Sequence, residues 1–78
     1  MTLDQITMPD AVRSEVNGIL IEIADAEGVL ELSRLGGITE GFSLGLGCSG
    51  AMDAAAVDAL ERIFTQAIGR RMADLRGR

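Results

Sequence analysis

The sequence predicts an α+β fold in which a short N-terminal helix, a three-stranded antiparallel sheet and a long C-terminal helix follow one another. Three observations lead to this prediction. Apolar residues recur with a helical spacing over residues 52–75. They alternate with other residues over residues 19–35, as in a β-hairpin, and again over residues 41–47, as in a third strand. The alternative is a small all-α bundle in which residues 8–35 are largely helical. A chain of 78 residues has room for one hydrophobic core, so we expect a single compact domain over residues 1–78.

The first helix is expected from Met8 to about Val16. Thr7 is a candidate cap, because its hydroxyl can accept a hydrogen bond from an amide of the first turn. Pro9 suits that turn, since the amide it lacks would be unpaired there anyway. The pair Asn17-Gly18 tolerates the left-handed conformation that ends many helices.

Residues 19–35 are predicted to form a β-hairpin whose loop is residues 25–28. Three isoleucines within residues 19–23 favour a pleated, half-buried surface. The loop begins with Asp and ends with Gly, as four-residue hairpin loops prefer. This register places Glu22 opposite Glu31, which is unfavourable. The competing helical interpretation puts two glycines inside helices, at about 1 kcal/mol each.

Gly36-Gly37 is predicted to break the chain before the third strand at residues 41–47. The glycines within that strand weaken it. The long helix that follows, from Met52 to Leu75, has apolar residues at steps of three and four along one side. We expect this helix to lie across one face of the sheet, with either Ser49 or Asp53 as its cap.

The composition excludes several kinds of catalytic site. The chain has no histidine, which removes histidine-based general-base and nucleophile systems and the usual zinc ligand sets. Its one cysteine, Cys48, cannot form an intrachain disulfide, which suits a reducing compartment. We therefore predict a protein that is not an enzyme and that has neither a cofactor nor a metal.

The segment Gly45-Leu-Gly-Cys-Ser-Gly50 matches the pattern G-x-G-x-x-G literally. In a dinucleotide-binding unit, these glycines let the backbone approach a pyrophosphate between a strand and a helix. That unit also requires a returning parallel strand, and here only one helix follows. We interpret the segment as a structural turn, and Cys48 within it as a packing residue rather than a reactive thiol.

The charges are divided along the chain. Residues 1–61 hold eleven carboxylates against two arginines, a balance of −9, whereas residues 62–78 hold five arginines against one aspartate, a balance of +4. The basic end, with Arg70, Arg71 and Arg76, is a secondary patch. Direct binding to nucleic acid is not expected, because the remaining chain repels phosphates and carries no groove-reading motif.

The acidic part suggests a protein partner with a basic surface. On the predicted hairpin, the residues expected to bind it are Glu22, Asp25, Glu27 and Glu31, with Glu15 and Glu40 at the rim. In size and acidity the chain resembles small acidic inhibitors encoded by phages and mobile elements, including some anti-CRISPR proteins. This resemblance implies a DNA mimic that occupies the arginine-lined channel of a nucleic-acid-handling complex and blocks DNA binding there.

The alternative function is that of a homo-oligomeric structural or regulatory protein. Its oppositely charged segments could attract one another head to tail, or its long helix could pair with a second copy as a homodimer. No run of residues approaches the length of a membrane span, and the amino terminus has no signal-peptide pattern. We therefore expect a cytoplasmic protein.

Overall fold

The computed structural model describes residues 2–77, which form three α-helices and one short 3-10 turn. The turn η1 (Leu3–Gln5) is followed by α1 (Asp10–Asp25), α2 (Val29–Ser49) and α3 (Ala54–Arg76). Helical residues make up 83% of the described chain, and none of residues 2–77 is in a strand. The predicted α+β fold with its three-stranded sheet is therefore wrong. The protein has a three-helix all-α fold, the class of the alternative.

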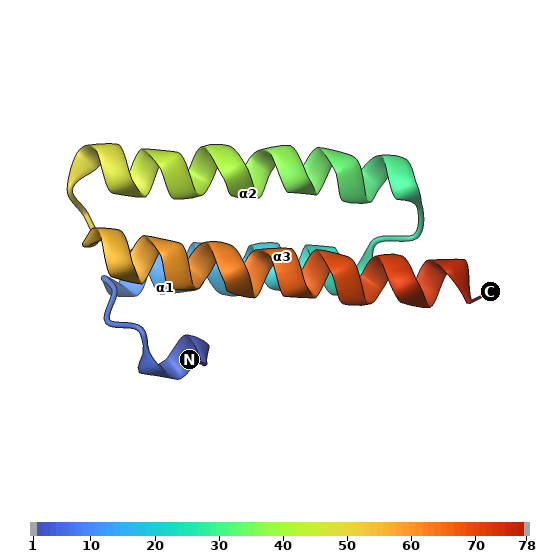
Figure 1. Ribbon diagram of the computed structural model, residues 1–78, viewed down its shortest axis with the longest axis horizontal. Helices are drawn as coiled ribbons and strands as arrows, with labels where there is room; N and C mark the ends of the chain where they lie inside the picture. The colour runs from blue at the N-terminus through green and yellow to red at the C-terminus, as the bar shows by residue number, and fades with distance from the viewer. Residues whose placement is uncertain (1, 78) are drawn as a thin grey trace.

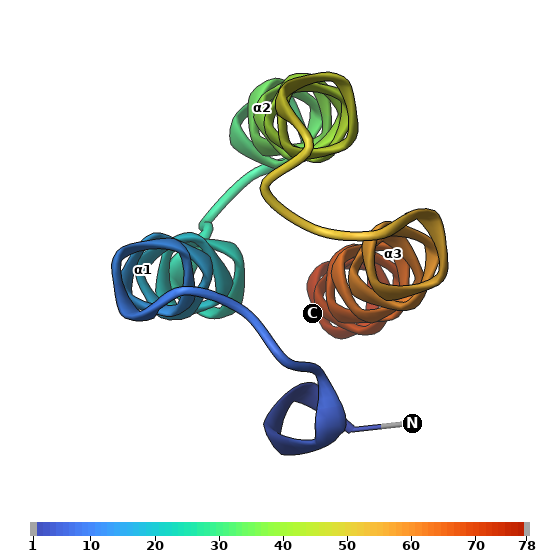
Figure 2. The same ribbon diagram turned by 90° about the vertical axis from the view of Figure 1, so that its left-hand side faces the viewer.

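The three helices lie side by side, with α2 running opposite to α1 and α3 (Figure 1). Viewed along their axes, they stand at the corners of a triangle, and η1 lies on the side of α1 and α3 away from α2 (Figure 2). Arg13 on α1 fixes η1, because its guanidinium donates to the carbonyl oxygens of Leu3 at 3.3 Å and Ile6 at 2.6 Å. No segment of residues 2–77 covers the side of α2 that faces away from the bundle (Figure 2).

The core is formed by side chains from all three helices and from the connections at their ends. Phe64 of α3 is 2% exposed. Its ring meets the ring of Phe42 from α2 edge to face, with centroids 6.4 Å apart. Such aromatic pairs add to the stability that comes from burial alone. The buried apolar residues are Ile6, Met8, Val16, Ile19, Ile23, Ala26, Leu32, Leu35, Leu46, Met52, Val57, Ala59, Leu60 and Phe64.

The predicted first strand is the second half of α1. Val16, Ile19 and Ile23 are buried at steps of three and four, whereas Ile21 is 62% exposed. The buried residues therefore follow the helical spacing of three and four, and not the alternating spacing of Ile19, Ile21 and Ile23. The turn predicted at residues 25–28 exists, but it joins two helices, so Glu22 and Glu31 do not face each other across a hairpin.

The predicted break at Gly36-Gly37 and the predicted third strand are both within α2. This helix contains five glycines, and none of them has a positive φ. Glycine in a helix interior costs about 1 kcal/mol relative to alanine, which is why the sequence favours a break here. Burial outweighs that cost. The residues of α2 that face the core, again at steps of three and four, are Leu32, Leu35, Thr39, Ser43 and Leu46.

The ends of the helices show which of the predicted capping residues cap a helix. The long helix is confirmed, and Asp53 is its cap, since its Oδ1 accepts a hydrogen bond from the amide of Ala56 at 2.8 Å. Ser49 lies instead in the last turn of α2, which ends at Gly50 with φ of 74°. The first helix begins at Asp10 rather than Met8 and continues to Asp25, because Gly18 remains helical.

Candidate functional site

The six carboxylates predicted to bind a partner are all exposed, but they lie on different parts of the bundle. They are Glu15 and Glu22 on α1, Asp25 at its end, Glu27 in the connection, Glu31 in the first turn of α2, and Glu40 in its middle. The fold gathers three of them around the α1–α2 connection. There the amide of Glu27 donates to Oε2 of Glu31 at 3.3 Å, so the carboxylate of Glu31 also supports the start of α2.

The basic patch lies at the same end of the molecule as this acidic connection. The C-terminal part of α3 carries Arg70, Arg71 and Arg76, and it runs beside the end of α1 (Figure 1). Nε of Arg71 donates to the carbonyl oxygen of Ala26 at 2.8 Å. Charges that are far apart in the sequence are therefore neighbours in the fold, and this end of the bundle has a mixed rather than a uniformly acidic surface.

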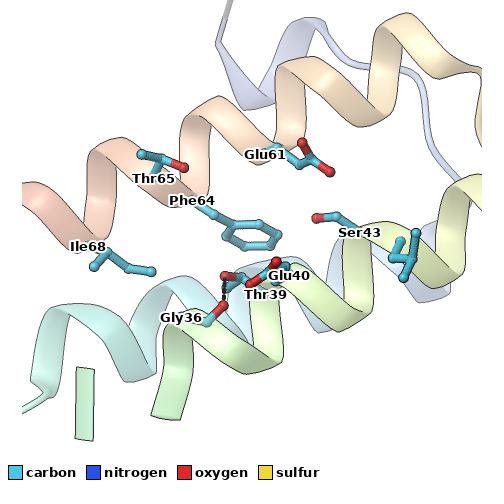
Figure 3. Close-up of a pocket in the computed structure, with 9 residues that line it drawn as sticks. Gly36, Thr39, Glu40, Ser43, Glu61, Phe64, Thr65 and Ile68 are labelled. Carbon is cyan, nitrogen blue, oxygen red and sulfur yellow. Dashed lines mark hydrogen bonds between the residues drawn. The ribbon is translucent and has the colours of Figure 1, made fainter. Parts of the chain in front are cut away.

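A groove of about 460 Å³ lies between α2 and α3 (Figure 3). The carboxylate of Glu40 reaches it from α2 and that of Glu61 from α3, while the ring of Phe64 lies between the two helices (Figure 3). The residues that line the groove are Gly36, Thr39, Glu40, Ser43, Leu44, Glu61, Phe64, Thr65 and Ile68.

The groove exists because the residues of α2 that face α3 are small. Gly36, Thr39 and Ser43 succeed one another at steps of three and four on the same side of the helix. A Cβ at Gly36 would lie 3.9 Å from Cδ1 of Ile68, so this glycine touches α3 without being crowded by it. Larger side chains at these three positions would fill the space between the helices.

Ser43 is the unusual residue of the groove. Its side chain is completely buried, and within residues 2–77 its Oγ is the buried side-chain polar atom without a hydrogen-bond partner. The hydroxyl points toward the space between Glu61 and the ring of Phe64 (Figure 3). One turn earlier, Thr39 has a partner, since its Oγ1 donates to the carbonyl oxygen of Gly36 at 2.9 Å. A buried hydroxyl left unpaired costs about 1–3 kcal/mol.

The glycine motif at residues 45–50 does not have the context of a nucleotide-binding loop. It forms the last turn of α2 and the left-handed residue that ends this helix, whereas α3 begins only at Ala54. Cys48 is exposed near the carboxyl end of α2, not buried as predicted, and it does not precede a helix amino terminus. No group of three or more Cys, Asp or Glu side chains within residues 2–77 could hold a metal ion.

Comparison with protein-family models, with curated proteins and with solved structures finds no match to this chain. Among the described helices, none is both long and apolar enough to cross a lipid bilayer.

The sequence indicated one of the polar residues of the groove and missed the others. The sequence predicts Glu40 at the rim of a partner site, but it places Ser43 in the expected third strand and gives Glu61, within the long helix, no predicted role. A signal for the groove was present, because Thr39 and Ser43 are four residues apart within a glycine-rich segment whose other polar residue is Glu40. It becomes visible only when that segment is interpreted as a helix.

Proposed function

We propose that this protein is a non-enzymatic interaction module that binds a basic segment of a protein partner in the groove between α2 and α3. The observation that carries the proposal is the unpaired, buried hydroxyl of Ser43 in a groove that the carboxylates of Glu40 and Glu61 also line. Two carboxylates attract a cation, and a hydroxyl that still lacks a partner provides a fixed acceptor beside them.

An arginine side chain fits this combination of groups best. Its planar guanidinium offers five donors, enough to serve two carboxylates and a hydroxyl together. The carbon stem of the arginine would pack against an apolar side chain of the lining, Leu44 from α2 or Ile68 from α3. A site that is partly apolar favours arginine over lysine, because a guanidinium is more weakly hydrated than an ammonium.

The other carboxylates support this role from a distance. The chain carries a net charge of −5, which raises the rate at which a basic partner reaches the surface. Exposed charges such as Glu15 and Glu22 contribute to that steering more than to the lifetime of the complex. We assign the long-lived contacts to the groove.

The partner class that we propose is a nucleic-acid-handling complex, whose arginine-rich surface normally binds phosphates. A carboxylate-bearing groove that holds one of those arginines would compete with nucleic acid for it and so act as an inhibitor. This wider role follows from the acidic composition and the choice of an arginine ligand.

Isothermal titration calorimetry with an arginine-rich peptide, at two salt concentrations, tests the groove. The double variant Glu40→Lys/Glu61→Lys is expected to lose at least tenfold in affinity, which corresponds to about 1.4 kcal/mol. The matched control is Glu15→Lys/Glu22→Lys, which changes the net charge equally on α1. It should weaken binding only slightly, and less so at high salt, because its effect is long-range.

Equal losses in the two double variants would overturn the proposal, since the groove would then contribute no more than general charge. Unchanged binding in Glu40→Lys/Glu61→Lys would overturn it as well. Circular dichroism of both variants should retain the helical spectrum, because all four positions are exposed.

A further inference from the structure

Apart from Arg34, the face of α2 that points away from the bundle is mostly apolar, and it carries no carboxylate. We call it the outer face of α2; it consists of Leu30, Arg34, Gly37, Gly41, Leu44 and Gly45, all of them exposed. Leu30 is 88% exposed and Leu44 is 66% exposed, and Ile38 at the edge of this face is 39% exposed. In a chain with twelve carboxylates, an apolar strip without one is the surface on which a second acidic molecule can approach without repulsion.

The three glycines of the outer face are not required by the packing of the described residues. Within residues 2–77, and apart from the adjacent residues and the nearby backbone of α2 itself, no heavy atom lies within 4 Å of the position that a Cβ would occupy on Gly37, Gly41 or Gly45, and their backbone is ordinary helix. Neither space nor conformation therefore requires glycine here, although glycine is a poor residue for a helix interior. What glycine does permit is the close approach of another backbone along this face.

The order of residues along the outer face is symmetric about Gly41. Gly37 and Gly45 stand four residues to either side of it, and the exposed Ile38 and Leu44 stand three residues to either side. A two-fold axis beside Gly41 would pair two copies of α2 antiparallel. Gly37 would then lie level with the other copy's Gly45, and Ile38 level with its Leu44, so that each large side chain packs beside a glycine of the other copy. Self-complementarity of this kind is what an isologous interface requires.

The charges agree with the same arrangement. Arg34 lies seven residues before Gly41, and Cys48 lies seven residues after it. The axis therefore brings Arg34 level with Cys48 in the last turn of the other copy's α2. That turn contains no basic residue of its own. The carbonyl groups at the carboxyl end of a helix attract a cation, and Arg34 of each copy would supply that cation to the other copy.

We propose that two copies of this chain associate antiparallel through the outer face of α2. The interface is limited to one helix face, so the dimer exchanges with the monomer rather than forming permanently. This association goes beyond the proposed function. It shares Leu44 with the groove but uses neither Ser43 nor Glu61, and the glycine variants below leave Leu44 in place, so each proposal can fail without the other.

Sedimentation equilibrium over a range of protein concentrations tests the association with two matched glycine variants. Gly37→Ala/Gly41→Ala alters the outer face, and Gly18→Ala/Gly69→Ala makes the same change at exposed helical positions on α1 and α3. At concentrations where the protein is monomeric, both variants should unfold at a higher temperature, because alanine favours the helix. Only the α2 variant should lose self-association, by at least tenfold in dissociation constant.

Disulfide trapping tests the register. In Gly41→Cys/Cys48→Ser, the new thiols lie on the two-fold axis, within the roughly 4–7 Å between Cα atoms that a disulfide spans. In Gly45→Cys/Cys48→Ser, each thiol lies about 12 Å along the helix from its counterpart, at about 1.5 Å per residue. Mild oxidation should give a covalent dimer from the first variant and not from the second.

A wild-type protein that remains monomeric at all concentrations would overturn the proposal. Equal loss of association in the two alanine variants would do the same, since the effect would then not belong to α2. Equal trapping of the two cysteine variants would show that the copies are not paired about Gly41.

Discussion

Ser43 and Thr39 lie one turn apart on the same side of α2, yet their hydroxyls differ in what they contact. Thr39 bonds to a backbone carbonyl of its own helix, as hydroxyl side chains in helices commonly do, whereas Oγ of Ser43 has no partner. An apolar residue at position 43 would suit the fold alone better. The occupant that we propose for the groove would give this hydroxyl a hydrogen-bond partner.

Replacement of this serine should separate stability from binding. Ser43→Ala removes the unpaired hydroxyl, so the free energy of unfolding should rise by about 1 kcal/mol, while the affinity for an arginine-rich peptide should fall. Urea denaturation measures the first effect and calorimetry the second. Ser33→Ala, at an exposed position of the same helix, is the control for helix propensity and should leave binding unchanged. A destabilised Ser43→Ala variant, or one that binds as tightly as the wild type, would contradict this account.

Among the elements, α3 could be predicted from the sequence and α1 and α2 could not be predicted in full. The stripe of α3 runs without interruption, and the buried Val57, Leu60 and Phe64 belong to it. Residues 19–23 satisfy both a helical and an alternating pattern, so their structure depends on what they pack against. Buried contacts from Ile19 and Ile23 with the rest of the core favour the helix, and this information is not local to the segment.

The case of α2 differs, because its apolar residues are spread around the helix. Leu30 and Leu44 are exposed while Leu32 and Leu46 are buried, so hydrophobicity alone does not reveal which side faces the core. The five glycines of α2 add a local preference against helix. The groove could therefore not be predicted either, because its small residues Gly36, Thr39 and Ser43 lie on the same side only if this segment is a helix.

The connection between α3 and the α1–α2 turn depends on one long side chain. Nε of Arg71 donates a hydrogen bond to the carbonyl oxygen of Ala26, which follows the end of α1. Arg71→Met keeps the carbon stem and removes the donor, so it should lower the free energy of unfolding by about 1 kcal/mol in thermal or urea denaturation. The neighbouring exposed Arg70→Met should change stability by less than about 0.5 kcal/mol. Similar losses for the two variants would show that charge, and not this hydrogen bond, secures the end of α3.

For the molecule as a whole, the fold changes the meaning of the charge pattern. In the sequence the acidic and basic segments are separate, but in the bundle the basic end of α3 lies beside the acidic α1–α2 connection (Figure 1). The carboxylates near that connection are therefore partly offset by arginines, whereas Glu40 and Glu61 flank a groove with an unpaired hydroxyl. We therefore expect a basic partner to bind in the space between α2 and α3, and not at residues 19–35 as the sequence predicts.

We propose that the groove, and not the α1–α2 connection, holds a basic ligand. Amide chemical shifts of the isotopically labelled wild-type protein, recorded during titration with an arginine-rich peptide, test it most directly. We predict that the largest changes occur at Glu40, Ser43, Glu61 and Thr65, and that they saturate together. Largest changes at residues 22–31, with the groove amides unaffected, would contradict the account.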